Sequence, residues 1–173
     1  MKGRMAEAQP TLIHVPAVKD LVDTPRWLAR LIVDHYEPHG RTLDPCMGNG
    51  VFYDCLPVVG REWCEIGKGR DFFLYDGYVD WIVSNPPYSI LLQWIRHSLL
   101  VADHVVYLLP LHRVMGSFQF VQDVAAWGGL REVFVLGTGT SVGFPFGHCM
   151  AAVHYEHGYR AGTKWTYWEG CCE

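Results

Sequence analysis

A chain of 173 residues, half of them hydrophobic, is long enough for one domain with one core and too apolar for an intrinsically disordered protein. Its formal net charge is −4, and its lysines and arginines are scattered singly, which disfavours tight autonomous binding to nucleic acid through phosphates. No apolar run approaches the roughly 18 residues that a membrane span needs, and no apolar segment follows the charged N-terminus, so we expect a cytoplasmic protein without a signal peptide.

The cysteine and histidine spacing gives no sign of a metal centre. None of the six cysteines belongs to a CxxC pair, and no histidine lies at a metal-ligand offset that repeats. In a reducing compartment the cysteines are expected to be free thiols. We therefore expect no metal site.

In chain order, residues 1–22 are expected to form an N-terminal arm, 23–157 the folded domain and 158–173 a C-terminal tail. Strands alternating with helices predict an α/β fold with a doubly wound, mostly parallel sheet. The last two strands have no helical pattern between them, so we expect a C-terminal antiparallel strand pair. The expected helices cover 25–37, 51–56, 91–100 and 118–127, and the expected strands cover 41–44, 62–66, 80–84, 104–109, 131–136 and 149–155.

The turn Asp44-Pro45-Cys46-Met47-Gly48-Asn49-Gly50 lies between an expected strand and an expected helix. Glycines at such a place let the backbone approach a ligand that a side chain would block, and the N–H groups at a helix N-terminus favour polar ligand groups. Glu65, at the end of the next strand, strengthens the pattern, because an acidic residue about 20 positions on accepts hydrogen bonds from ribose hydroxyls in doubly wound nucleotide sites.

The tetrapeptide Asn85-Pro86-Pro87-Tyr88 follows the expected strand over 80–84. Each proline fixes φ near −65° and lacks an N–H, so the turn is rigid and its carbonyl groups are free to accept hydrogen bonds. Asn85 adds a side-chain oxygen, and Tyr88 adds a flat ring. Two convergent acceptors beside a ring suit a planar group that carries an NH2.

Together, these segments resemble the amino-methyltransferases with an Asn-Pro-Pro-Tyr motif, a group of class I methyltransferases that use S-adenosylmethionine (SAM). The resemblance runs from about residue 23 to about 155, with the cofactor turn before the Pro-Pro turn. The run from Gly69 to Phe73, followed by Asp80 to Tyr88, is also similar to small phage-encoded DNA modification enzymes. The resemblance implies a Rossmann-like class I methyltransferase fold and SAM as the cofactor.

The same resemblance implies roles for individual residues. The turn from Asp44 to Gly50 would cradle the methionine portion, and Glu65 would bind the ribose. Asp71 and Phe72 would lie beside the adenine ring, and the segment 24–25 would help to hold the methionine carboxylate. The implied cofactor-binding residues are Thr24, Pro25, Asp44, Pro45, Cys46, Gly48, Gly50, Glu65, Asp71, Phe72 and Asn85, and the implied catalytic residues are Asn85, Pro86, Pro87 and Tyr88.

The Pro-Pro turn suits an amine that is a poor nucleophile. The lone pair of an adenine amino nitrogen is delocalised into the ring, and acceptors on both N–H bonds would localise it. We assign these acceptors as the Asn85 side-chain oxygen and the Pro86 carbonyl, so positioning and electrostatics would carry the rate. Tyr88 would stack on the target base, which must leave a DNA duplex to reach the site. Further candidates for substrate binding are Phe144, Phe146 and Arg113, although one phenylalanine could belong to the core and Arg113 to a solvated loop.

The leading interpretation is transfer of a methyl group from SAM to the N6 of adenine in nucleic acid, with DNA preferred to RNA. Methylation of RNA adenine, methylation of a protein glutamine amide and a non-catalytic partner subunit with the same fold remain alternatives. We expect no separate target-recognition domain in 173 residues. Sequence specificity would then be low, or would come from a partner chain or a homodimer.

Overall fold

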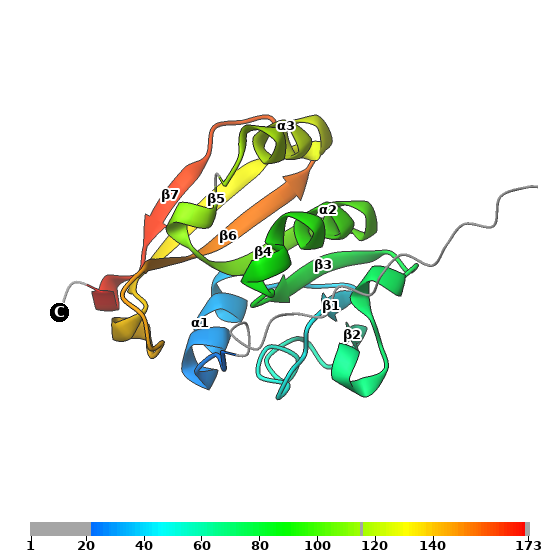
Figure 1. The fold of residues 1–173 in the computed structure, drawn as a ribbon, viewed down its shortest axis with the longest axis horizontal. Coiled ribbons are helices and arrows are strands. Elements are labelled where there is room, and N and C mark those ends of the chain that lie inside the picture. The colour runs from blue at the N-terminus through cyan, green and yellow to red at the C-terminus, as the bar shows by residue number, and fades with distance from the viewer. Residues whose placement is uncertain (1–21, 115, 172–173) are drawn as a thin grey trace, which may run out of the picture.

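The computed structural model describes residues 22–114 and 116–171, and within them seven strands form one mixed sheet of order β2-β1-β3-β4-β6-β5-β7 (Figure 1). Strands β1 to β4 run parallel to one another, β6 pairs antiparallel with both β4 and β5, and β7 pairs parallel with β5. This confirms the predicted α/β fold with a mostly parallel sheet and a C-terminal antiparallel pair. The strands are β1 (Thr42–Asp44), β2 (Arg61–Trp63), β3 (Val79–Ser84), β4 (Ala102–Pro110), β5 (Gly128–Thr138), β6 (Cys149–His157) and β7 (Lys164–Tyr167).

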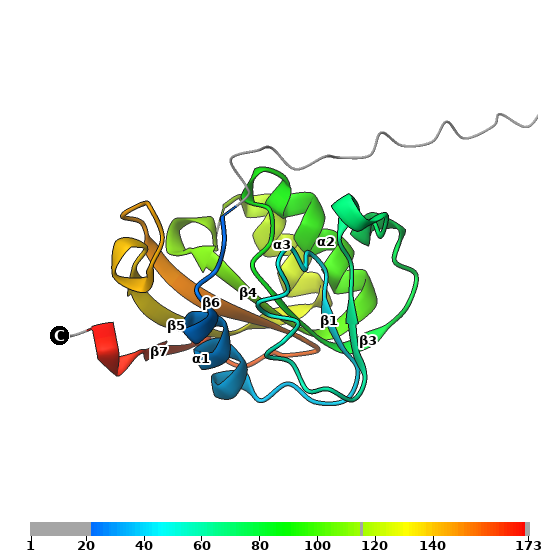
Figure 2. The same cartoon turned by 90° about the horizontal axis from the view of Figure 1, so that it is seen from below.

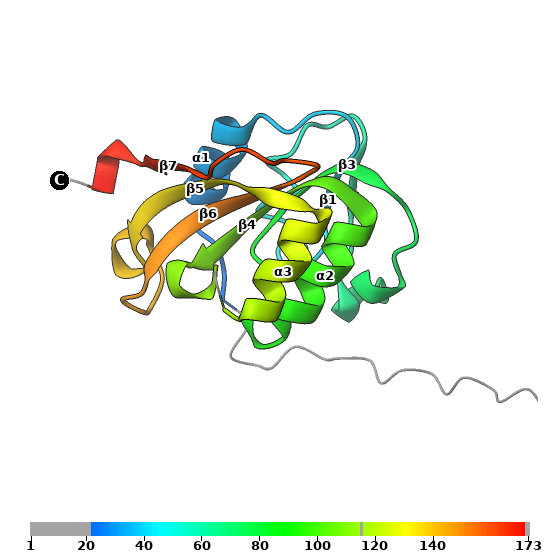
Figure 3. The same ribbon diagram turned by 90° about the horizontal axis from the view of Figure 1, so that it is seen from above.

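Helices cover both faces of the sheet. Helix α1 (Arg26–Tyr36) packs on one face, where it crosses β5 and β6 (Figures 1 and 2). Helices α2 (Leu91–Val101) and α3 (Phe118–Trp127) pack on the other face (Figure 3). None of the helices in the described ranges has the length and apolar content needed to cross a membrane.

The central strands are buried on both sides, so their side chains divide between two cores. On β3, Ile82 belongs to the cluster under α2 and α3, whereas Trp81 and Val83 belong to the cluster under α1. This alternation is the period-two geometry of a strand. Because both faces of β3 and β4 are buried, their sequences are nearly continuous apolar runs, as expected for parallel strands covered by helices.

The helix expected over 51–56 is not formed. The segment makes a single helical turn, in which the N–H of Asp54 donates to the carbonyl of Gly50 at 2.8 Å and that of Leu56 donates to Phe52 at 3.0 Å. Pro57 then ends the turn. Too few residues separate Gly50 from this proline for helix propagation to offset the cost of nucleation. The buried Phe52 and Leu56 nevertheless fill the core on the α1 face.

The sheet continues beyond residue 157, where we expected the domain to end. Strand β7 adds an edge to β5, with Val133 opposite Trp165 and Val135 opposite Tyr167. The two aromatic residues of β7 suit a strand, but a stretch of four residues is too short to stand out as a pattern. The expected N-terminal arm lies outside the described residues except for Val22.

Candidate active site

A cavity of about 650 Å³ opens at the carboxyl ends of β1, β2 and β3. Ligand sites in open α/β sheets form at this edge, because the loops that leave parallel strands gather there. The cavity brings together most of the residues that we expected to bind a cofactor. Those that line it are Thr24, Asp44, Pro45, Cys46, Gly48, Glu65, Asp71, Phe72 and Asn85, whereas Pro25 and Gly50 lie outside the lining.

Asp44 ties the cofactor turn to the end of β3. Its carboxylate is only 1% exposed and accepts hydrogen bonds from the Ser84 hydroxyl at 2.6 Å and from the N–H groups of Tyr53 at 3.1 Å and Cys46 at 3.4 Å. Burial raises the pKa of Asp44 to about 6, although these hydrogen bonds favour the charged form. Ser84 was not predicted, although its position next to Asn85 at a strand end is a signal that could have found it.

The thiol of Cys46 links the cofactor turn to the Pro-Pro turn. The Cys46 thiol donates to the backbone carbonyl of Asn85 at 3.1 Å and lies 3.1 Å from the Ser84 hydroxyl. Burial raises the pKa of Cys46 well above its usual value, so the group is a neutral donor and not a nucleophile. The carbonyl of Asn85 is therefore fixed from the cofactor side of the cavity.

Glu65 closes the glycine turn. One carboxylate oxygen accepts from the N–H of Gly48 at 2.7 Å, and the other accepts from the N–H of Gly67 at 3.1 Å. Gly48 and Gly50 have φ angles of +51° and +84°, in the left-handed region that favours glycine. Each carboxylate oxygen has a second lone pair, so Glu65 can hold the turn and still accept from a ligand hydroxyl.

The opposite wall of the cavity is apolar. Ile66, Phe72, Pro87 and Trp94 line it, and the rings of Phe72 and Trp94 lie 4.8 Å apart. Asp71 holds this wall in place, because its side chain accepts from the N–H of Phe73 at 3.0 Å. Ile66 and Trp94 were not among the residues predicted from the sequence. The buried Trp94 does pack in the core, but it also forms part of the cavity wall.

The side-chain amide of Asn85 is held at both ends. Its nitrogen donates to the Thr24 hydroxyl at 3.1 Å, and its oxygen accepts from the Tyr88 hydroxyl at 2.7 Å. This pattern of partners sets the amide orientation. The oxygen has a second lone pair, so one acceptor position on Asn85 remains for a further donor.

Tyr88 and Pro86 do not line the cavity, although we expected both to contact the substrate. The Tyr88 hydroxyl lies 2.7 Å from the Asn85 side-chain oxygen and 3.2 Å from the carbonyl of Leu108, and its ring packs against the core under α2 and α3. Tyr88 is absent from the cavity lining, so the structure does not present its ring as a stacking surface. Pro86 is buried and also outside the lining, whereas Pro87 faces the cavity.

The late aromatic loop lies at the same edge of the sheet but does not line the cavity. Phe144 is only 3% exposed and packs in the core under α1, so its expected role as a stacking residue conflicts with its burial. Phe146 stacks on it at 5.3 Å and lies 5.8 Å from the ring of His148. Arg113 is exposed on the short helix η5 (Leu111–Arg113), which leaves the carboxyl end of β4.

Besides the hydrogen bond between Thr24 and Asn85, two further contacts join the segment before α1 to the rest of the site. The Asn49 amide donates to the Asp23 carboxylate at 2.8 Å. A Cβ added to Gly143 in the late loop would lie 2.7 Å from Cγ of Pro25, so this loop packs directly on Pro25. Pro25 thus braces Thr24 from outside the cavity.

The polar lining of the cavity is acidic. Four carboxylates line it, and no Lys, Arg or His is found among the described residues of the lining. One basic group lies beside the lining, because the Lys68 ammonium donates to the carbonyl of Gly48 at 3.3 Å. Opposite charges attract most strongly where water is excluded, so the cavity suits a cationic ligand and opposes an anionic one. The four carboxylates belong to Asp23, Asp44, Glu65 and Asp71.

The sequence matches no protein-family model and no curated protein sequence. Solved structures do resemble the fold. One is a candidate class I S-adenosylmethionine-dependent methyltransferase of Listeria monocytogenes, with a TM-score of 0.66 and 11% identity over 92% of this chain and 69% of that one.

Two further similar structures come from restriction-modification systems. The methyltransferase subunit of a type I system of Streptococcus thermophilus has a TM-score of 0.61 and 11% identity over 84% of this chain and 47% of that one. The modification subunit of a candidate type I restriction enzyme of Vibrio vulnificus has a TM-score of 0.59 and 13% identity over 84% and 46%. The present chain spans less than half the length of these two proteins. At such identities the likeness shows the fold, which is that of the class I methyltransferases.

Proposed function

We propose that this protein is a SAM-dependent N-methyltransferase that acts on the exocyclic N6 of adenine in DNA. One observation carries the proposal: a cavity with an acidic lining ends at Asn85, the first residue of a rigid Asn-Pro-Pro-Tyr turn. The turn supplies hydrogen-bond acceptors, and the cavity supplies the attraction for a positively charged donor molecule.

The residues of the cavity fit SAM better than a nucleotide with phosphates. SAM carries a sulfonium and an ammonium group, which the carboxylates of the lining attract, whereas the phosphates of ATP or NAD would be repelled. Glu65 has a free lone pair on each oxygen for the ribose hydroxyls, and Ile66 and Phe72 offer an apolar wall for the adenine ring. A volume of about 650 Å³ suits a ligand of this size.

When bound, SAM supplies an electrophilic methyl group. The protein then has to position an amine and polarise it. The free lone pair of the Asn85 oxygen and the backbone carbonyl of Pro86, whose ring is buried outside the cavity lining, would accept hydrogen bonds from the two N–H groups of the amine. These hydrogen bonds would localise the lone pair on the amine nitrogen. The Thr24 and Tyr88 hydroxyl groups keep the Asn85 amide in the required orientation. The methylated nitrogen would then lose its extra proton to water, so this scheme requires no strong general base.

Adenine in DNA is the substrate that the sequence resemblance favours. Two of the similar structures are modification or methyltransferase subunits of type I restriction-modification systems, and this similarity supports DNA as the substrate. The net charge of −4 means that DNA contacts must be local or shared. Arg113 and His148, exposed at the edge where the Pro-Pro turn lies, are the local candidates, and a partner chain or a second copy would supply the rest.

Calorimetric titration with SAM tests the cofactor assignment. The wild type should bind SAM, and Glu65→Gln should weaken binding about 10- to 100-fold, because a hydrogen bond to a charged group contributes roughly 1.5–3 kcal/mol. Glu62→Gln is the matched control, since Glu62 pairs with Arg41 outside the cavity and should leave the affinity within about twofold. A wild-type protein that does not bind SAM would favour a non-catalytic subunit.

Incubation with labelled SAM and separate pools of DNA, RNA and protein tests the substrate. We expect label in DNA, at the N6 position of adenine. The Asn85 acceptors could also bind the side-chain amide of glutamine, so label confined to protein would keep the methyltransferase assignment and overturn the substrate. Label confined to RNA would do the same.

A further inference from the structure

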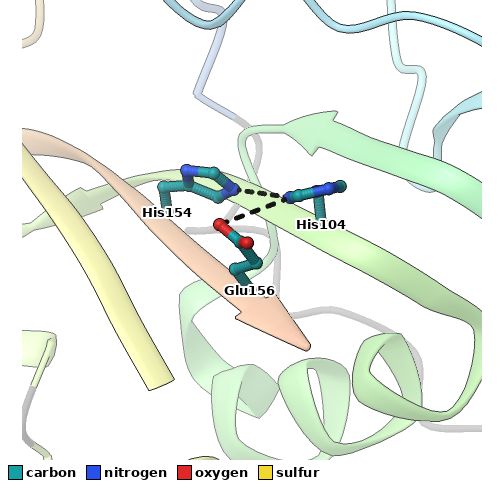
Figure 4. A group of neighbouring side chains, drawn as sticks. All are labelled: His104, His154 and Glu156. Carbon is teal, nitrogen blue, oxygen red and sulfur yellow. Dashed lines mark hydrogen bonds and ion pairs between the residues drawn. The ribbon is translucent and has the colours of Figure 1, made fainter. Parts of the chain in front are cut away.

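A second cluster of reactive side chains lies at the opposite edge of the sheet from the cavity, near the start of β4 (Figure 4). His104 is the third residue of β4, and His154 and Glu156 lie two positions apart on β6. The antiparallel register pairs His104 with Glu156 and Val106 with His154. Because side chains alternate along a strand, all three point to the same face of the sheet.

The ligand atoms of these three residues already lie close together. The His104 Nδ1 atom is 3.1 Å from the His154 Nε2 atom and 3.9 Å from a Glu156 carboxylate oxygen. All three candidate ligand atoms fall within 4.8 Å of one another. Two nitrogen ligands, each about 2.0–2.1 Å from a tetrahedral zinc ion, are roughly 3.4 Å apart, so small side-chain shifts would suffice to hold an ion.

Both imidazoles are held in place by their surroundings. His154 is 3% exposed and His104 is partly buried. The Trp81 ring stacks on both rings, with centroids 4.2 Å from His104 and 5.1 Å from His154, which fixes their orientation.

A small polar cleft gives access to the cluster. It has a volume of about 220 Å³ and is lined by His104 and Glu156 together with His39, Asp80, Asp103 and other residues. The cleft could hold the water molecules that complete a coordination shell. The present competitor for Glu156 is Arg131, which forms an ion pair with it. The Arg131 side chain is half exposed and lies 5.6 Å from the Tyr159 ring centroid, so it can leave Glu156 without being buried unpaired.

We propose that His104, His154 and Glu156 bind one divalent cation of the zinc class, with water on the side that faces the cleft. Two imidazoles and one carboxylate suit Zn²⁺, Co²⁺ or Ni²⁺ rather than Mg²⁺ or Ca²⁺, which prefer oxygen ligands. The ion bridges β4 and β6 at the point where the sheet changes from parallel to antiparallel. Bound metal therefore stabilises the fold and is independent of SAM binding.

From the sequence we expected no metal site, because it contains no short repeating spacing of metal ligands. His104 and His154 are fifty positions apart, and only the strand register brings them together. The spacing of His154 and Glu156 is the ordinary strand period and carries no signal of its own.

Titration of the metal-free protein with Co²⁺ tests the proposal. We expect one Co²⁺ per chain with visible d–d absorption, without the near-ultraviolet thiolate charge-transfer band that cysteine ligands would give. His104→Gln and Glu156→Gln should each weaken Co²⁺ binding at least tenfold. His148→Gln is the matched control, because it removes an exposed histidine outside the cluster, whose ring centroid lies 4.8 Å from that of His112. This variant should bind Co²⁺ like the wild type.

Thermal unfolding provides a second measurement. Saturating Zn²⁺ should raise the midpoint of the wild type by several degrees, EDTA should reverse the rise, and His104→Gln should abolish it. The metal-free midpoints of the variants establish that they fold. A wild type without a Co²⁺ signal, a signal with thiolate character, or variants that bind Co²⁺ as tightly as the wild type would each overturn the proposal. None of these outcomes depends on SAM, so they leave the proposed methyl transfer untouched.

Discussion

At the scale of single residues, the proposed methyl transfer depends on the amide of Asn85. Its nitrogen is fixed by Thr24 and its oxygen by Tyr88, so its remaining acceptor position is oriented before any substrate arrives. Preorganised acceptors are effective because they need no rearrangement as charge develops. We therefore propose that Tyr88 acts through its hydroxyl, as a positioning residue, and not through the face of its ring.

Tyr88→Phe separates these two roles. It removes the hydroxyl and keeps the ring, so we expect methyl transfer to fall about three- to tenfold, in line with the loss of one neutral hydrogen bond. SAM affinity should stay the same. Tyr78→Phe is the matched control, because its exposed hydroxyl bonds to Asp103, far from the site. Steady-state kinetics of both variants decide the matter, and an unchanged rate for Tyr88→Phe would instead favour stacking.

Asp44 predicts a dependence of stability on pH. Burial raises its pKa from 3.8 to about 6, so the folded state binds a proton more tightly than the unfolded chain. The stabilisation that this proton provides is complete below pH 4 and is lost as the pH rises through 6. The loss amounts to about 3 kcal/mol, at 1.36 kcal/mol for each pKa unit.

Urea unfolding of the wild type and Asp44→Asn between pH 4 and pH 7 measures this loss. The free energy of unfolding of the wild type should decline relative to that of Asp44→Asn up to pH 6 and then run parallel to it. Asp34→Asn, which alters an exposed carboxylate on α1, should follow the wild type throughout. Parallel curves for all three proteins would show that Asp44 is not a buried carboxyl group with a raised pKa.

At the scale of elements, the late loop between β5 and β6 is braced against the segment before α1. Gly143 has a φ of +95°, and a Cβ there would lie 2.7 Å from the Pro25 ring. Gly143→Ala should therefore destabilise the protein by about 1–2 kcal/mol and weaken SAM binding, because it displaces Pro25 and with it Thr24. Gly147→Ala in the same loop is the control, since no heavy atom lies within 4 Å of its added Cβ. Equal behaviour of the two variants in thermal unfolding and SAM titration would contradict this role.

The elements also show what a sequence can reveal. Strand β3 and helices α2 and α3 could be predicted because their apolar patterns are long and regular. The segment 51–56 was expected to be helical but forms only a turn. Its local pattern does not show whether so short a segment can offset the cost of helix nucleation. Strand β7 was missed because its four residues gain their stability from pairing with β5, which is a tertiary contact.

For the site, the residue types could be predicted but not the side-chain directions. The turn around Gly48 and the acidic Glu65 do line one cavity, as their positions at strand ends indicated. Tyr88 turns inward because acceptors on Asn85 and Leu108 are within reach of its hydroxyl, and Leu108 is twenty positions away in the chain. Phe144 packs in the core under α1, which is formed by apolar residues from distant parts of the chain. The chemical roles of these residues stay predictions.

At the scale of the whole molecule, the distribution of charge decides which ligands can enter. The chain has a net charge of −4, and four carboxylates line the cavity. A negative potential in a cleft attracts cations and repels anions over several ångströms. We therefore expect the cavity to favour a nucleoside that bears positive charge.

Competition experiments test this selection. S-Adenosylhomocysteine should displace labelled SAM, since it shares the adenosine and amino acid portions, and uncharged adenosine should compete more weakly. ATP should compete at least tenfold more weakly than adenosine, because its phosphates meet the carboxylates of the lining. Raising the salt concentration should narrow the gap between ATP and adenosine. An ATP affinity equal to or greater than that of adenosine would contradict the charge argument.

The central claim is that Asn85 polarises an adenine amine beside a bound methyl donor. Mass spectrometry of nucleosides from DNA incubated with SAM measures it directly. The wild type should form N6-methyladenine, and Asn85→Ala should form at least about a hundredfold less, the usual loss for a preorganised electrostatic group, while its SAM affinity stays within about threefold. Equal product from Asn85→Ala and the wild type would contradict the account.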